Sequence, residues 1–97
     1  MTRQRLAARI EQDVERIAEH LRQHEVADIG ARIDEMLGAL QLLVRHPLIG
    51  RPVGDGLREL VIGKGSHGYV ARYRYDPVKD EVRVAALRSQ REGGFRG

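Results

Sequence analysis

Basic side chains are the residues of this chain whose type and spacing could do chemistry. Only Lys64 and Lys79 of the 17 Lys and Arg residues are lysines, and the planar guanidinium of arginine suits paired hydrogen bonds to carboxylate or phosphate. The set comprises Arg58, Lys64, Arg72, Arg74, Arg83, Arg88 and Arg91, interleaved with Tyr69, Tyr73, Tyr75 and Phe95. It predicts a surface that grips RNA or an acidic protein. On RNA, such a surface could stabilise the charge that develops in metal-independent attack by the 2′-OH.

The net charge of +3 is unevenly distributed along the 97 residues. Residues 1–56 carry eight basic and nine acidic side chains (−1), whereas residues 57–97 carry nine basic and five acidic ones (+4). The positive second half suits an acidic partner or nucleic acid. A plainer interpretation stays open, in which the arginines form a solvated face and pair across strands with Glu59 or Glu81.

Other kinds of site have little support in the sequence. The chain has no cysteine, which excludes disulfides and thiolate metal sites. His20 and His24 share a helical spacing but lack a third ligand, so we expect no metal and no cofactor. Residues 63–68 are rich in glycine but lack the spacing and the following helix of a phosphate loop. Ser66 and His67 are adjacent and cannot act as nucleophile and base in the usual way.

The size and hydropathy of the chain indicate one small domain. No apolar run approaches the roughly 20 residues of a membrane span, and the charged start, residues 1–9, lacks the apolar core of a signal peptide. We therefore expect a cytoplasmic protein with no membrane partner.

The first half of the chain predicts a helical hairpin over residues 3–45. Apolar residues at spacings of three and four predict a helix over residues 3–24, with an outer face of Glu11, Asp13, Glu15, Arg16, Glu19 and Arg22. Thr2 could cap this helix, although a short strand before it stays open. Asp28 is the expected N-cap of a second helix over 29–45, Gly38 could let the first helix approach closely, and Pro47 ends the second helix.

The second half of the chain predicts strands. Residues 46–56 are rich in proline and glycine and predict a loop. The apolar period then changes to two, which predicts strands over 57–62, 69–75 and 81–87, with a turn over 76–80. Residues 88–97 form a basic, polar tail.

These elements predict an α+β fold, in which the antiparallel helical hairpin packs on one face of a three- to four-stranded antiparallel sheet. The sheet spans residues 57–87. If the helices cover the face with Tyr69, Ala71 and Tyr73, then Arg72 and Arg74 face solvent on the other side.

The chain resembles the ParE/RelE family of toxins from bacterial type II toxin–antitoxin systems. The motifs that carry the resemblance are His46-Pro47-x-Ile49-Gly50-Arg51-Pro52, Leu57-Arg58-Glu59-Leu60, Gly68-Tyr69-Val70-x-x-Tyr73-Arg74-Tyr75 and Arg88-x-x-Arg91-Glu92. Their order and spacing are more specific than any one of them. Many family members begin with a strand, and the first five residues here are a poor one.

The resemblance implies a growth-arresting toxin, often linked to plasmid stabilisation, that a cognate antitoxin neutralises in a hetero-oligomer. RelE-like members cleave messenger RNA on the ribosome, whereas ParE-like members inhibit DNA gyrase and are not nucleases. The ribonuclease branch usually has an arginine after the Gly-Tyr pair, where this chain has Val70, and a tyrosine near the C-terminus, where it has Phe95. These departures favour a non-enzymatic, ParE-like gyrase inhibitor. The alternatives are a RelE-like ribonuclease and an inactive homologue that only binds an antitoxin.

Two sets of site residues follow from this interpretation. The expected target-binding residues are Arg58, Lys64, Arg72, Arg74, Arg88, Arg91 and Phe95. If the chain is a ribonuclease, the catalytic candidates are Arg72, Arg74, Arg88 and Arg91. Apolar Leu48, Ile49 and Val53 are candidate antitoxin contacts, although packing beneath the loop is the favoured interpretation of these three.

Overall fold

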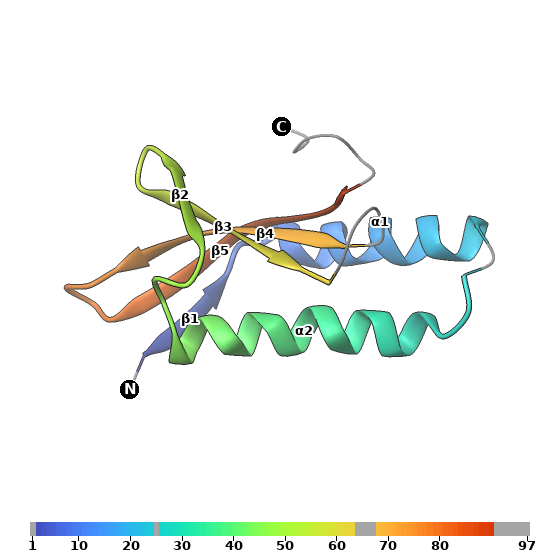
Figure 1. Cartoon of the computed structure of the whole chain (residues 1–97), viewed down its shortest axis with the longest axis horizontal. Helices are drawn as coiled ribbons and strands as arrows, with labels where there is room; N and C mark the ends of the chain where they lie inside the picture. The colour runs from blue at the N-terminus through green and yellow to red at the C-terminus, as the bar shows by residue number, and fades with distance from the viewer. Residues whose placement is uncertain (1, 25, 64–67, 91–97) are drawn as a thin grey trace.

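The computed structural model describes residues 2–24, 26–63 and 68–90, which form an α+β fold of two helices and five strands. Strand β1 (Arg3–Leu6) comes first, before helices α1 (Arg9–Gln23) and α2 (Ile29–Arg45). The other strands follow, namely β2 (Arg51–Gly54), β3 (Leu57–Ile62), β4 (Tyr69–Asp76) and β5 (Glu81–Ser89). The two helices run antiparallel to each other alongside a single sheet (Figure 1).

The sheet is mixed and five-stranded, so the prediction of a three- to four-stranded antiparallel sheet is wrong in both respects. Its order is β1-β5-β4-β3-β2, with β1 parallel to β5 and the other neighbours antiparallel. Residues 3–6 belong to β1 and not to the predicted first helix, which begins at Arg9. The parallel partner β5 supplies the hydrogen bonds of β1, and such long-range pairing overrides local propensity.

The second correction concerns residues 46–56, which were predicted to be a loop throughout. Arg51–Gly54 is a strand at the edge of the sheet, where proline is tolerated because no ladder hydrogen bond is lost. The turn that follows lies in the left-handed region, with φ of 100° at Gly54, 53° at Asp55 and 74° at Gly56. Glycine reaches this region without a steric cost, so the glycines here serve the turn of a β2–β3 hairpin.

Several predicted boundaries are confirmed. Helix α2 ends at Arg45, just before His46 and Pro47, and β3 spans the predicted residues 57–62. Between β4 and β5, the Asp76 carboxylate accepts hydrogen bonds from the backbone N–H groups of Val78 and Lys79. Strand β5 extends to Ser89, so the predicted tail over 88–97 begins inside the sheet.

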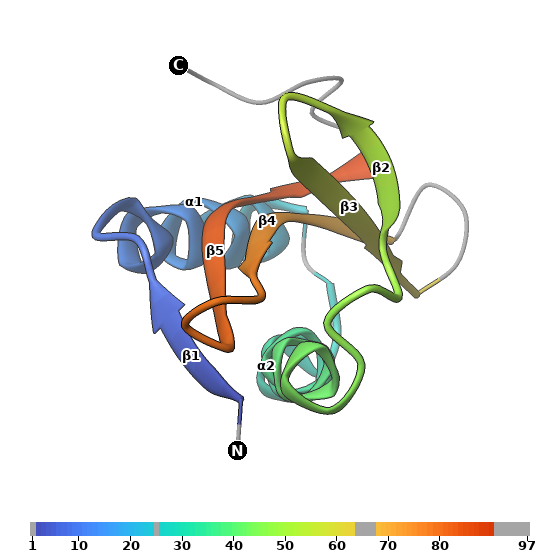
Figure 2. The same ribbon diagram turned by 90° about the vertical axis from the view of Figure 1, so that its left-hand side faces the viewer.

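One apolar core joins both helices to the sheet face that carries Tyr69, Ala71 and Tyr73, as predicted. Figure 2 shows both helices lying beside the sheet. Its other buried members are Ile10, Ile17, Leu21, Met36, Leu40, Leu43, Ile62, Val82, Val84 and Leu87. Gly38 lies outside this core. It is exposed, and a Cβ atom added there would meet nothing within 4 Å, so the prediction that it accommodates the first helix is wrong.

Two expected helix caps act differently from the prediction. Asp28 precedes α2 as expected, but it has a φ of 61° and its side chain forms no capping hydrogen bond. Thr2 does not cap α1, because its hydroxyl donates to the Asp80 carboxylate at 2.7 Å. This bond and the one from the Tyr75 hydroxyl lower the pKa of Asp80 below its ordinary value. Thr2 therefore ties the start of the chain to the β4–β5 turn.

Candidate functional site

A row of alternating charges crosses three strands on the sheet face opposite the tyrosines. Arg51 of β2, Glu59 of β3 and Arg72 of β4 are register partners. Arg72 Nη2 lies 2.8 Å from Glu59 Oε2, and Arg51 Nη2 lies 3.7 Å from Glu59 Oε1. The side chain of Glu59 is only 8% exposed, whereas that of Arg51 is 75% exposed. One buried carboxylate therefore holds two guanidinium groups, and Arg51 presents its charge to solvent.

Further arginines extend this row into a surface that we call the arginine face, defined as Arg51, Arg72, Arg74, Arg83 and Arg88. Arg74 is the register partner of Arg83, and it donates a hydrogen bond to the Asp55 carbonyl in the β2–β3 turn. The side chain of Arg83 is 45% exposed. Its hydrogen bond to Glu81, 2.6 Å long, lowers the pKa of the Glu81 carboxyl and raises the pKa of Arg83.

The structure separates the predicted target-binding residues into three groups. Arg72, Arg74 and Arg88 come together on the arginine face, and Arg72 pairs with Glu59 as the plainer interpretation proposed. Lys64, Arg91 and Phe95 lie outside the described residues.

Arg58 lies apart from the arginine face, because its register partner is the core residue Tyr73. Its Nη1 atom donates to the carbonyls of Leu48, at 3.2 Å, and Gly50, at 2.7 Å. Arg58 therefore holds the segment between α2 and β2 against β3, and a role in target binding stays a prediction. Arg51 is absent from the predicted set because the composition of residues 46–56 predicts a loop. Arg51 precedes Pro52, and a residue before proline favours extended backbone, so this position was the available signal for a strand.

A glycine and a tyrosine fix the start of β2 above the core. The backbone N–H of Gly50 donates to the buried Tyr73 hydroxyl at 2.8 Å. A Cβ atom at Gly50 would lie 2.7 Å from Tyr73 Cε1 and 2.9 Å from the Glu59 carbonyl oxygen. Only glycine fits this close approach without a shift of its neighbours, so the His46–Pro52 motif positions Arg51.

The tyrosine and histidine side chains that the structure describes lie off the arginine face. Tyr69 and Tyr73 are 2% and 0% exposed on the core side, and the Tyr75 hydroxyl donates to Asp80. Val70 is 2% exposed and pairs in register with Arg88. Of the described histidines, His20 of α1 and His24 just after it have ring centroids 4.2 Å apart and ring planes tilted by 38°, and His46 follows α2.

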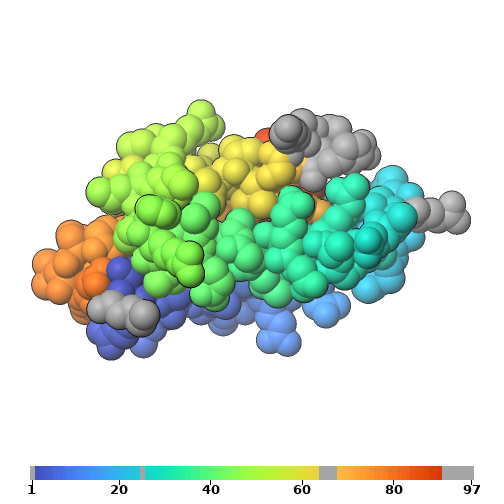
Figure 3. Space-filling view, turned by 60° about the horizontal axis from the view of Figure 1, so that its bottom comes forward, coloured from blue at the N-terminus to red at the C-terminus, as the bar shows by residue number. Residues whose placement is uncertain are grey.

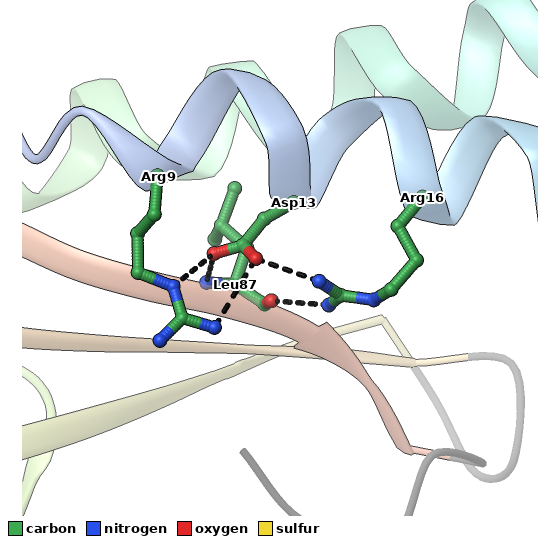
Figure 4. A network of polar contacts seen from close by, with 4 residues as sticks. All are labelled: Arg9, Asp13, Arg16 and Leu87. Atoms are coloured by element: carbon green, nitrogen blue, oxygen red, sulfur yellow. Dashed lines mark hydrogen bonds and ion pairs between the residues drawn. The ribbon is translucent and has the colours of Figure 1, made fainter. Parts of the chain in front are cut away.

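A buried carboxylate on α1 supports the strand that carries Arg83 and Arg88 (Figure 4). The side chain of Asp13 is 2% exposed. Its Oδ2 atom accepts the backbone N–H of Leu87 at 3.0 Å, and its Oδ1 atom accepts Arg16 Nη1 at 2.7 Å. Arg9 adds a third contact, at 3.2 Å, and Arg16 Nη2 donates to the Leu87 carbonyl at 2.9 Å. Burial raises the pKa of Asp13, but the Leu87, Arg16 and Arg9 contacts outweigh it and hold the pKa below its ordinary value.

This network, which we call the Asp13 clamp, replaces a missing strand. Strand β1 pairs with β5 only as far as Val84, and α1 lies along β5 beyond that point. The Asp13 carboxylate accepts the Leu87 N–H, and the Arg16 guanidinium donates to the Leu87 carbonyl. A longer β1 would otherwise form hydrogen bonds with these two backbone groups. The prediction that both residues lie on the solvent face of the first helix is wrong for Asp13. Its spacing from the buried residues Ile10 and Ile17 places it on the apolar stripe and was the available signal.

Comparison with known proteins identifies the family of this chain. Residues 4–93 match the family described as the ParE toxin of type II toxin–antitoxin systems, parDE. The chain belongs to the ParE toxin family. A relative, Toxin RelE3 of Caulobacter vibrioides, is 31% identical over 87 residues, which cover 90% of this chain and 92% of the relative.

Membership of the ParE toxin family implies an antitoxin partner for this chain. The three candidate antitoxin contacts lie on the surface, because Leu48 is 61%, Ile49 47% and Val53 38% exposed. The favoured interpretation, in which they pack beneath the loop, is therefore wrong. Beside them lies a cavity of about 390 Å³, lined by Leu48, Pro52, Gly54, Gly56, Leu57, Arg58, Tyr75 and Pro77.

Two further findings concern residues 2–24, 26–63 and 68–90 alone. None of the helices there is both long and apolar enough to cross a membrane. No three His, Cys, Asp or Glu side chains in these ranges gather closely enough to hold a metal ion.

Proposed function

We propose that this ParE-family toxin inhibits DNA gyrase by binding it and does not cut RNA. The observation that carries the proposal is the composition of the arginine face. Metal-independent attack by a 2′-OH needs a positioned general base and a general acid. The described tyrosines are buried or tied to Asp80, and Val70 stands where the ribonuclease branch has an arginine. The carboxylates nearest the arginines, Glu59 and Glu81, are already ion-paired.

Binding alone requires less of this surface. Arg51 and Arg83 project well-exposed guanidinium groups from β2 and β5, and each is oriented by a mostly buried carboxylate. Guanidinium groups held in this way suit an acidic protein surface or DNA phosphates. In the bacterial cytoplasm, such binding would corrupt DNA-strand passage and arrest growth, which is the behaviour that stabilises plasmids in this family.

A supercoiling assay with purified gyrase and toxin tests this proposal. We expect the wild-type toxin to inhibit at micromolar concentration, and the double variant Arg51→Ala/Arg83→Ala to need about tenfold more protein, because two exposed charge contacts are lost. Arg22→Ala is the matched control, since Arg22 forms an exposed ion pair with Glu19 on α1, away from the arginine face. Absence of inhibition by a micromolar excess of wild-type toxin would refute gyrase as the target.

The name of the relative, Toxin RelE3, favours a second candidate, ribosome-dependent cleavage of messenger RNA. In that case Arg72, Arg74, Arg88 and Arg91 are the catalytic candidates. Toeprinting on translating ribosomes distinguishes the two, because a binding-only toxin leaves the message uncut. A chain that binds an antitoxin but arrests no growth would instead be an inactive homologue.

For the antitoxin, we propose docking on the edge of β2 and on Leu48, Ile49 and Val53. Strand β2 is the last strand of the sheet, so its outer edge can accept an extended antitoxin segment, and the three apolar side chains lie beside it. Leu48→Asp/Ile49→Asp should weaken antitoxin binding at least about tenfold in calorimetry. Leu6→Asp is the control, because Leu6 is 47% exposed in β1, at the opposite edge of the sheet from β2. Equal binding by both variants would exclude this surface.

A further inference from the structure

The outer face of α2 exposes two leucines to solvent. Leu37 is 43% and Leu42 38% exposed, and Gly38 and Gln41 between them are also exposed. Gly38, Gln41, Leu42, Val44 and Arg45 line a shallow depression of about 590 Å³. Figure 3 shows α2 running lengthwise along the surface of the molecule. A glycine inside a helix costs about 1 kcal/mol relative to alanine, and nothing within the described chain packs against Gly38.

Two opposite charges lie at the ends of this face. Asp34 is exposed one turn before Gly38, and Arg45 is exposed one turn after Gln41. Neither forms an ion pair within the described part of the chain. Along the helix, this face therefore carries the negative charge of Asp34, then a centre that includes the two leucines and Gly38, and then the positive charge of Arg45.

We propose that this face binds a second copy of the same chain, with the two α2 helices antiparallel. The register that places Gly38 opposite Gln41 of the second copy also places Asp34 opposite Arg45 of the second copy, because both pairs are related by the same four-residue step. The two-fold axis repeats each contact, as in any isologous dimer. Leu42 then lies over the space beside Gly38 of the second copy, where the absence of a side chain lets the helices approach closely.

Charge selects both the partner and the orientation. A parallel pair would set Asp34 against Asp34 and Arg45 against Arg45, which repel. The antiparallel pair turns both contacts into attractions and uses only residues of this chain. The surface lies on α2, away from the arginine face, so the inference does not depend on which target the toxin binds.

Sedimentation of the purified toxin tests the proposal directly. We expect a concentration-dependent shift to twice the monomer mass. Asp34→Arg or Arg45→Asp alone should weaken self-association about tenfold, because each sets like charges opposite each other twice. The double variant Asp34→Arg/Arg45→Asp should restore it, and so should an equimolar mixture of the two single variants. A wild-type toxin that stays monomeric up to about 100 µM, or a double variant that associates no better than the single ones, would overturn the proposal.

Cross-linking gives a second readout, because the native chain has no cysteine. Disulfides require Cα atoms within about 7 Å, so Asp34→Cys/Arg45→Cys should form a covalent dimer on mild oxidation, whereas each single cysteine variant should stay monomeric. Efficient cross-linking of Asp34→Cys alone would indicate a parallel pair and contradict the proposal. If Leu42→Glu weakens antitoxin binding while the wild-type toxin stays monomeric, the face belongs to the antitoxin and the proposal fails.

Discussion

Replacing Asp13 by alanine should lower the free energy of unfolding by about 2–4 kcal/mol. The Leu87 N–H would be left buried without an acceptor, which costs about 1–3 kcal/mol. Loss of the charge-assisted bonds from Arg16 and Arg9 adds about 1 kcal/mol, a modest figure because these side chains are 27% and 34% exposed. Asp13→Asn keeps an acceptor for Leu87 and should cost less, about 1–2 kcal/mol. The total free energy of unfolding of a domain of this size is roughly 5–15 kcal/mol.

Urea denaturation followed by circular dichroism measures these differences. The matched control is Glu19→Gln, since Glu19 also pairs with an arginine three residues later on α1, but its side chain is 55% exposed. That exposed pair should contribute less than about 1 kcal/mol. If Asp13→Ala loses no more stability than Glu19→Gln, the argument that α1 replaces a missing strand beside β5 is refuted.

Three further predictions concern the same fold. Gly50→Ala should lower the free energy of unfolding by about 1–3 kcal/mol, because the added methyl group overlaps Tyr73. Gly30→Ala should raise it by about 0.5 kcal/mol, because a methyl group there meets nothing within 4 Å. Thermal melts in which both variants shift the melting temperature alike would contradict the packing described. Tyr73→Phe should lower the free energy of unfolding by about 1–3 kcal/mol, because it leaves the Gly50 N–H without an acceptor. Tyr75→Phe should lower it by less than about 1 kcal/mol, because the Tyr75 hydroxyl is half-buried. Equal shifts of the urea midpoint for the two variants would count against this role of the Tyr73 hydroxyl. The fold lowers the pKa of Asp13 below its ordinary value of 3.8. The stability that ionised Asp13 contributes is therefore present above that pH and is lost as the pH falls through the lowered pKa. If the free energy of unfolding of Asp13→Asn falls with acid pH as steeply as that of the wild type, this prediction is excluded.

The features that the sequence predicted well are those that depend on local periodicity. The change of apolar period from about four to two located both helices and strands β3, β4 and β5, and it assigned Tyr69 and Tyr73 to the core and Arg74 to the opposite face. Strand β2 was missed and β1 was only left open as an alternative, because each has four residues. Such short segments carry too few alternating positions to reveal a period, and their pairing comes from distant strands.

The candidate site shows the same division. Arginine-rich composition predicted a basic surface, but it did not predict that Glu59 would hold Arg51 and Arg72, or that Arg58 would bind the carbonyls between α2 and β2. These contacts depend on the register of three strands, which a single sequence does not fix.

The amino-acid sequence by itself determined the two helices, strands β3, β4 and β5, the side of these strands that faces the core, and the excess of positive charge in the second half, because these follow from residue types and their spacings. Only the tertiary structure decided which arginines share a surface, why Asp13 is buried and that β1 lies beside β5. The physical reason is that each of these depends on hydrogen bonds between residues far apart in the chain, as when the Asp13 carboxylate accepts the N–H of Leu87.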